Sequence, residues 1–105
     1  MNDQWTPWNL LSATVGVGVT TDGWNLSEGA DEPRVFVVEV TFSAPFNAVP
    51  VIQLGLTGFD MDQRDSGRIR LKTTDITPAG FKVEISTWLD TRIYAVEFSW
   101  LAIGG

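Results

Sequence analysis

Apolar and polar side chains alternate one by one along most of this chain, as they do in strands that bury one face. In the stretch FKVEISTW, Phe81, Val83, Ile85 and Thr87 fall on one side, and the polar side ends in Trp88. The other alternating stretches and their in-phase members are RVFVVEVTF with Phe36, Val38, Val40 and Phe42; VIQLGLTGF with Ile52, Leu54 and Leu56; RIRLKT with Ile69, Leu71 and Thr73; and RIYAVEFSW with Tyr94, Val96, Phe98 and Trp100. No stretch shows a convincing helical period, so the chain is predicted to be all-β.

Turn-forming segments separate these stretches. Pro45 and Pro50 mark a connector, DMDQRDSG reads as a polar loop, TDITPAG as a turn, and Asp90 with Thr91 as a tight loop. Residues 1–33 are less regular. They hold a possible strand, with Ala13, Val15, Val17 and Val19 in phase and Gly16 and Gly18 opposite, where close backbone approach or bending is expected, and then a long polar loop at 21–33. Five or six short strands predict one antiparallel β-sandwich domain over residues 1–105.

Composition excludes several classes of chemistry. The 105 residues include no cysteine and no histidine, so disulfides, thiolate metal sites, cysteine nucleophiles and a Ser-His-Asp triad are ruled out. The net charge of −6 argues against nucleic acid or anionic membranes as partners. The N-terminus shows no secretory signal pattern, and no run of about 18 apolar residues predicts a membrane span.

Three features stand out as candidate binding groups. The alternation puts Trp88 on the solvent side of its strand, where a flat aromatic ring suits the C–H face of a sugar. A subunit contact, or a tryptophan folded back over the core, is about as probable from the sequence alone. Arg68 opens the polar face of RIRLKT, and Gly29 to Asp31 lie in the long loop. Arginine and carboxylate groups suit vicinal sugar hydroxyls, although alone each is an ordinary surface or turn residue.

Two further patterns of acidic residues bear on possible ion or catalytic sites. Asp60, Asp62 and Asp65 are spaced like the start of a calcium loop, but the glycine and final glutamate of that pattern are misplaced, which favours a solvated loop. A carboxylate pair for glycoside hydrolysis stays open, although no spacing favours one. The predicted protein is therefore not an enzyme and needs neither metal nor cofactor.

The sequence also resembles the H-type lectin domain family, which includes snail agglutinins and the C-terminal domain of slime-mould discoidins. The resemblance covers roughly residues 34–103 and rests on VTFSAPFNAVPVIQLGLTGFD, RIRL and ITPAGFKVEISTWLDTRIYAVEFSWLAIG. It implies a six-stranded antiparallel sandwich that assembles as a homotrimer. Shallow sites between neighbouring subunits of such a trimer would bind N-acetylgalactosamine or galactose.

The resemblance implies a set of sugar-binding residues. They are Gly29, Asp31, Arg68, Trp88, Leu89 and Tyr94. Trp88 would form the aromatic wall, Arg68 would hydrogen-bond the sugar, and Tyr94 would line the pocket although its alternation places it with the core. Leu89 stands where the snail agglutinin that favours N-acetylgalactosamine has a histidine, so it can pack against a sugar but cannot hydrogen-bond it.

We therefore expect a metal-independent lectin whose partners are galactose-type glycans, acting outside the cell or at a cell surface, for example in adhesion. Neither nucleic acid nor membrane insertion is expected. The alternative is a structural or adhesion module with the same sandwich, in which Trp88 lies in a protein interface and no sugar site exists.

Overall fold

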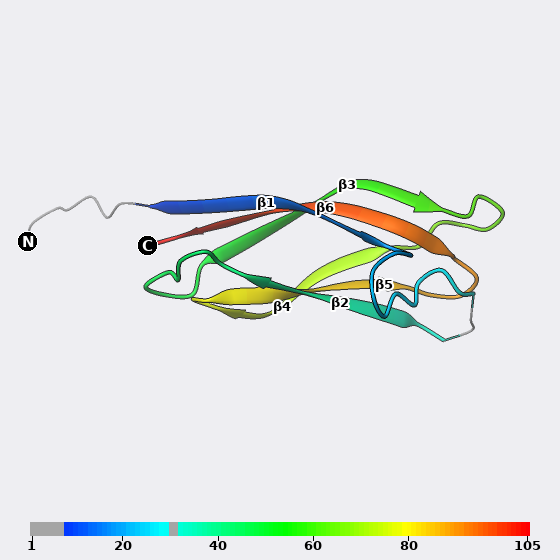
Figure 1. Cartoon of the computed structure of the whole chain (residues 1–105), viewed down its shortest axis with the longest axis horizontal. Helices are drawn as coiled ribbons and strands as arrows, with labels where there is room; N and C mark the ends of the chain where they lie inside the picture. Colours follow the sequence, from blue (N-terminus) through cyan, green and yellow to red (C-terminus); the bar gives the residue numbers. More distant parts are fainter. Residues whose placement is uncertain (1–7, 30–31) are drawn as a thin grey trace, which may run out of the picture.

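The chain folds into two three-stranded antiparallel sheets packed face to face (Figure 1). The computed structural model describes residues 8–29 and 32–105. Its strands are β1 (Asn9–Gly18), β2 (Arg34–Thr41), β3 (Val51–Met61), β4 (Arg70–Thr77), β5 (Gly80–Thr87) and β6 (Ile93–Gly104). The strand order is β1-β6-β3 in one sheet and β2-β5-β4 in the other. The predicted all-β antiparallel sandwich is confirmed.

The core lies between the two sheets because one face of each strand is apolar. Along β5, Phe81, Val83, Ile85 and Thr87 are buried, while the residues between them are half-buried. Aromatic rings fill one part of this core and pack edge to face or tilted. That cluster comprises Phe42, Phe46, Phe81 and Trp100, with ring centroids 5.2–5.8 Å apart.

The two middle strands, β5 and β6, are consecutive in the chain. Each is paired on both sides, β5 with β2 and β4, and β6 with β1 and β3. The β5–β6 loop (residues 88–92) therefore crosses from the centre of one sheet to the centre of the other. Figure 1 shows this loop at the same end of the sandwich as the β1–β2 and β3–β4 connections.

A bulge resolves the position of Tyr94, which alternation alone placed with the core. Along β6 the pairing with β3 passes from Ala95 opposite Asp60 to Ile93 opposite Met61, so Tyr94 is the unpaired extra residue. Ile93 and Val96 can consequently both point inward, and both are buried. Tyr94 is only half-buried, so the expectation that it shares the core side is wrong.

Other expectations also need correction. Val19 lies beyond the end of β1 and is 59% exposed, so it does not continue the in-phase set, and Ala13 is exposed as well. Only Gly18 has the expected close approach: a Cβ there would lie 2.5 Å from the Tyr94 carbonyl oxygen, whereas one at Gly16 would meet nothing within 4 Å. Leu56 is 40% exposed although it pairs with buried Phe98.

The segment TDITPAG is mostly strand. β4 runs on to Thr77, with a register irregularity between Thr74 and Thr77 where Asp75 has a φ of 51°. The turn itself is thus confined to Pro78 and Ala79.

The β1–β2 connection is long and polar, as predicted, but it is anchored by the apolar side chains of Trp24 and Leu26, which pack against the core. Leu26 is completely buried, and its carbonyl accepts a 2.7 Å hydrogen bond from the Ile93 amide. This anchor brings the connection against the start of β6.

No helix in the described residues is long and apolar enough to cross a membrane.

The packing at Gly80 predicts a strong substitution effect. A Cβ there would overlap the backbone carbonyl oxygen of Val40 on the neighbouring strand, which cannot move without disturbing the β2–β5 register. Gly80→Ala should lower the free energy of unfolding by about 1–3 kcal/mol in urea denaturation. Gly58→Ala is the matched control, because its Cβ would meet only the Glu97 side chain at 3.7 Å. Equal stability of the two variants would contradict the prediction.

Candidate carbohydrate-binding site at the β5–β6 loop

The described residues of the predicted site all border the β5–β6 loop. Trp88 and Leu89 belong to it, Tyr94 follows it in β6, and Arg68 hydrogen-bonds to its Thr91. Gly29 approaches the same loop from the β1–β2 connection, since a Cβ there would lie 3.1 Å from the Arg92 guanidinium. Asp31 lies outside the described residues. Gly29 and Tyr94, which are 65 positions apart in the sequence, thus lie at the same end of the sandwich, beside the loop that joins the two sheets.

Trp88 is positioned by an arginine that the alternation places on the same face. The Cζ atom of Arg70 lies 5.4 Å from the centroid of the indole ring, within the range of a cation–π contact. Arg70 is exposed on the outer face of β4, so the ring lies on the outer side of the β2-β5-β4 sheet. The half-buried ring is therefore held at the edge of the sheet and does not fold into the core.

Arg68 is not a freely solvated surface residue. Its Nη1 atom donates to the Thr91 hydroxyl at 3.0 Å and to the Ser66 carbonyl at 3.3 Å. Thr91 is buried, and its own hydroxyl donates to the Ser66 carbonyl. The guanidinium is thereby fixed against the β5–β6 loop as a preorganised hydrogen-bond donor.

Leu89 adopts an uncommon backbone conformation that a second arginine supports. Its φ is 58°, in the left-handed region that costs non-glycine residues energy. The Nη2 atom of Arg34 donates a 2.6 Å hydrogen bond to the Leu89 carbonyl. The Leu89 side chain is 46% exposed beside Trp88.

Arg34 is a functional candidate that the sequence reasoning missed. It is 9% exposed, and its Nε and Nη1 atoms are buried without a hydrogen-bond partner among the described residues. Burial, followed by the nearby charge of Arg92, lowers the pKa of Arg34. The signal was available, because the alternation that turns Phe36 and Val38 inward also turns Arg34 inward.

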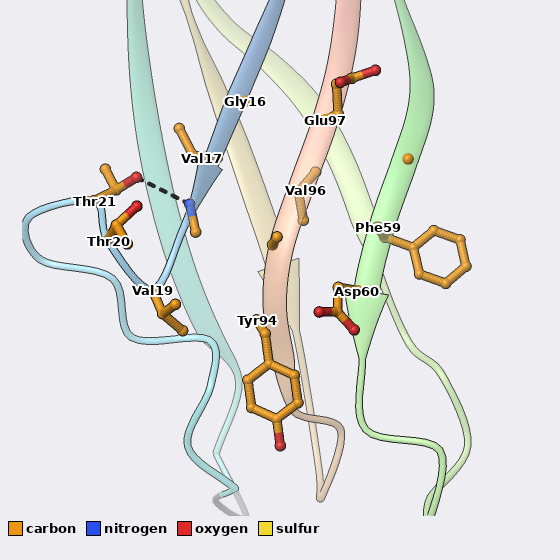
Figure 2. Close-up of a pocket in the computed structure, with 13 residues that line it drawn as sticks. Gly16, Val17, Val19, Thr20, Thr21, Phe59, Asp60, Tyr94, Val96 and Glu97 are labelled. Atoms are coloured by element: carbon orange, nitrogen blue, oxygen red, sulfur yellow. Dashed lines mark hydrogen bonds between the residues drawn. The ribbon is translucent and has the colours of Figure 1, made fainter.

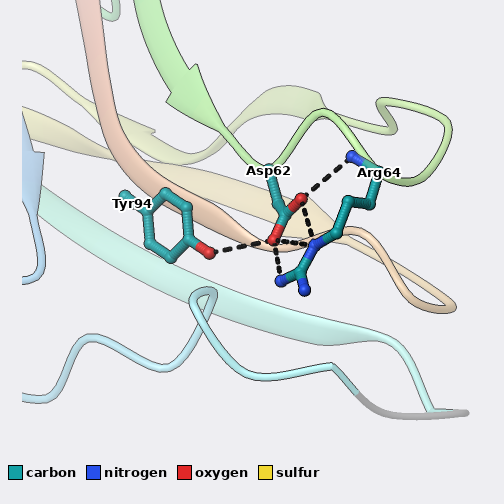
Figure 3. A network of polar contacts seen from close by, with 3 residues as sticks. All are labelled: Asp62, Arg64 and Tyr94. Carbon is teal, nitrogen blue, oxygen red and sulfur yellow. Dashed lines mark hydrogen bonds and ion pairs between the residues drawn. The ribbon is translucent and has the colours of Figure 1, made fainter.

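Tyr94 belongs to a polar network at the start of the β3–β4 loop (Figure 3). Its hydroxyl donates to the Asp62 carboxylate at 3.2 Å, and the same carboxylate accepts from the Arg64 side chain and backbone amide. The Asp62 side chain is only 10% exposed. The hydrogen bonds from Arg64, and then that from Tyr94, hold the pKa of Asp62 far below its usual range.

A shallow depression adjoins Tyr94 on the outer face of the β1-β6-β3 sheet (Figure 2). Its volume is about 470 Å³, and Gly16, Gly18, Gly58 and Ala95 leave its floor without large side chains. Tyr94 and Asp60 lie at one end of it and Glu97 at the other, as Figure 2 shows. Of the predicted sugar-binding residues that the structure describes, Tyr94 is the one that lines this depression.

The three aspartates of the β3–β4 region do not form an ion site in this structure. Asp62 is engaged by Arg64 and Tyr94, while Asp60 and Asp65 are exposed. Within residues 8–29 and 32–105, no group of three or more acidic, histidine or cysteine side chains is close enough to hold a metal ion.

The depressed pKa of Asp62 makes a prediction about pH. The pKa of Asp62 in the folded protein lies below its unfolded value of about 4. Its contribution to the stability of the fold is therefore complete above that pH and is lost as the pH falls below it. The difference in unfolding free energy between wild type and Asp62→Asn should be constant from about pH 7 to about pH 5 and shrink below about pH 4. Asp65→Asn, an exposed change in the same loop, is the control. A difference that grows on acidification would contradict the assignment.

Comparison with known sequences agrees with the motifs quoted above. Residues 37–103, more than half of the chain, match the H-type lectin domain. The chain is 41% identical over 83 residues to a Fuscovulum blasticum protein described as ATP synthase subunits region ORF 7, covering 79% of this chain and 71% of that protein. It is 28% identical over 92 residues to Discoidin-2 of Dictyostelium discoideum, covering 86% of this chain and 35% of that protein.

Solved structures agree on the fold. Native recombinant discoidin II of Dictyostelium discoideum superposes with a TM-score of 0.79 at 21% identity, over 99% of this chain and 40% of that one. Wild-type discoidin II gives the same TM-score over 98% of this chain and 39% of that one. This chain thus spans about two-fifths of the length of discoidin II. From its sequence match and its fold, the chain belongs to the H-type lectin domain family.

Proposed function

We propose that this protein is a lectin that binds galactose-type sugars at the β5–β6 loop. The observation that supports this most directly is the environment of Trp88, a half-buried ring that Arg70 holds on the outside of the sheet. A sugar would stack its C–H face on the part of the indole that Arg70 leaves open. Arg68, fixed by Thr91, would hydrogen-bond to a ring hydroxyl.

The family resemblance supports N-acetylgalactosamine or galactose as the sugar, and Leu89 bears on the choice between them. An exposed leucine beside Trp88 can pack against an acetyl methyl group or the sugar ring. It cannot donate the hydrogen bond that a histidine would donate there. We therefore propose that plain galactose binds about as well as N-acetylgalactosamine.

We also propose a homotrimer whose subunits meet through the small-residue face, the outer face of the β1-β6-β3 sheet. Its members with small side chains are Ser12, Thr14, Gly16, Gly18, Gly55, Gly58, Ala95 and Ser99. Leu10 and Val51 extend it with apolar side chains that are 62% and 61% exposed. Glu97 also lies there, where it accepts a hydrogen bond from Thr57. Small and apolar surfaces allow close subunit contact, and interface centres are poor in charge.

The outer face of the other sheet is less suited to be the trimer contact, because it carries many charged side chains. The charged face, the outer side of β2-β5-β4, carries Glu39, Arg70, Lys72, Lys82 and Glu84. Assembly through the small-residue face would leave the charged face and Trp88 accessible. Tyr94 borders the small-residue face, so a neighbouring subunit could complete the site with its own β1–β2 connection. Each shallow site would bind weakly, and three sites together would gain avidity on a multivalent glycan surface.

A structural or adhesion module without a sugar site is the second candidate. The observation that favours it is the small-residue face itself, which suits assembly whether or not sugar binds. In this reading Trp88 would contact protein instead of sugar. The two candidates differ in what the loss of Trp88 does to the oligomer.

Replacing Trp88 should weaken sugar binding strongly without changing assembly. Trp88→Ala should weaken binding of lactose and of N-acetylgalactosamine at least about tenfold in calorimetry, because the stacking surface is lost. Trp8→Ala, the same chemical change at a 70% exposed position, should leave both affinities unchanged.

Light scattering without sugar distinguishes the two candidates. If Trp88→Ala dissociates the oligomer, the tryptophan is interfacial and the structural module is favoured. If the wild type binds no galactose-type glycan on an array, the proposed specificity is wrong.

The assembly has its own test. Thr14 is exposed midway along β1 on the small-residue face, so Thr14→Arg should convert the trimer to a folded monomer in sedimentation or light scattering. Thr41→Arg makes the same change at an exposed position of β2 and should leave the trimer intact. A monomeric wild type, or a Thr14→Arg variant that remains trimeric, would show that this face is not the contact.

A further inference from the structure

The charged face holds an unassigned groove next to Trp88. It has a volume of about 200 Å³ and is lined by Val35, Arg70, Lys72, Glu84 and Ser86. The strand register explains why these side chains meet: Arg70 and Val35 both pair with Ser86, and Lys72 pairs with Glu84. Arg70 and Lys72 are two residues apart on one face of β4, so their backbone positions lie about 7 Å from each other.

These two cations are notable in an acidic protein. The sequence has 7 Lys and Arg against 13 Asp and Glu, yet two of the cations face the groove with Glu84 as the one acidic lining residue. In the part of the chain that the structure describes, the ion pairs are Arg64–Asp62, Lys82–Glu39 and Lys82–Asp75, so neither Arg70 nor Lys72 is in one. Their charge is therefore available to an anion from outside.

Arg70 connects the groove to the proposed sugar platform. Its guanidinium lies over the Trp88 ring, with Cζ 5.4 Å from the ring centroid, and it carries a planar fork of N–H donors. A planar N–H fork matches the oxygens of a carboxylate or a sulfate in a bidentate manner. Lys72 adds a second cation farther along the same strand, and Ser86 a hydroxyl between them and Val35.

We propose that Arg70 and Lys72 form a second subsite that binds the carboxylate or sulfate ester of an acidic saccharide. A galactose-type residue of that saccharide would occupy the Trp88 site, and the anionic group attached to it, a sulfate ester or an acidic sugar, would extend along β4. This inference rests on the proposed lectin function, because it takes Trp88 as the platform. Glu84 would oppose the anion, so the subsite favours acidic glycans without excluding neutral ones.

The test compares three ligands of matched core: lactose, 3′-sialyllactose and 3′-sulfolactose. The wild type should bind at least one acidic ligand about five- to tenfold more tightly than lactose in calorimetry. That gain should decrease as the ionic strength rises from about 0.05 M to about 0.5 M, because the shorter Debye length screens exposed charges. The sialylated and sulfated ligands distinguish a carboxylate from a sulfate as the preferred anion.

Charge variants locate the gain on β4. Lys72→Gln should bring the ratio of acidic to neutral affinity close to one, and Glu84→Gln should raise it. Lys82→Gln is the matched control on the same face, because Lys82 is already paired with Glu39 and Asp75, and it should leave the ratio unchanged. The opposite signs expected for Lys72→Gln and Glu84→Gln keep the test decisive even if one variant folds poorly.

The outcomes separate the two proposals. Lactose binding that requires Trp88, without any gain for the acidic ligands, would overturn the subsite and leave the lectin function intact. An equal loss of the gain in Lys82→Gln would also overturn it, since overall charge would then be responsible. If the wild type binds none of the three ligands, the lectin function is overturned and with it the subsite.

Discussion

The β5–β6 loop is the connection on which the rest of the structure depends. It joins the middle strand of one sheet to the middle strand of the other, and its Thr91 is almost fully buried, as are the flanking residues Thr87 and Ile93. Arg34 and Arg68 donate hydrogen bonds to its Leu89 carbonyl and Thr91 hydroxyl, and the Ile93 amide just after it donates to the Leu26 carbonyl, so three different segments are tied to this connection. The sandwich and the candidate site are therefore stabilised by the same contacts.

Most of the fold was predictable because a strand with one buried face imposes a period of two on its sequence. That rule placed Val83, Ile85 and Phe98 in the core correctly. It failed where the backbone departs from regular pairing. The extra residue at Tyr94 shifts the phase within β6, and no local residue pattern announces such a bulge. Leu26 escaped notice because isolated apolar residues in a polar connection show no period.

The candidate site was predictable to a similar extent. Alternation and the family motifs identified Trp88 and Arg68, and the structure puts both at the β5–β6 loop. The contacts that fix them come from residues far apart in the sequence. The stacking of Arg70 on Trp88 depends on the register of β4 with β5, and the bond from Arg34 to Leu89 spans 55 positions. Such pairings follow from strand neighbours, which a single sequence does not specify.

The left-handed backbone at Leu89 limits the ligand preferences that are open to the proposed sugar site. Branched residues are strained at a φ of 58°, whereas glycine, asparagine, aspartate and histidine adopt it more readily. Position 89, beside Trp88, therefore favours glycine, which has no side chain, or residues whose side chains can hydrogen-bond. Leucine is an unusual occupant, so a single substitution there could both relax the backbone and introduce a polar contact to sugar. The backbone thus acts as a filter on the accessible specificities.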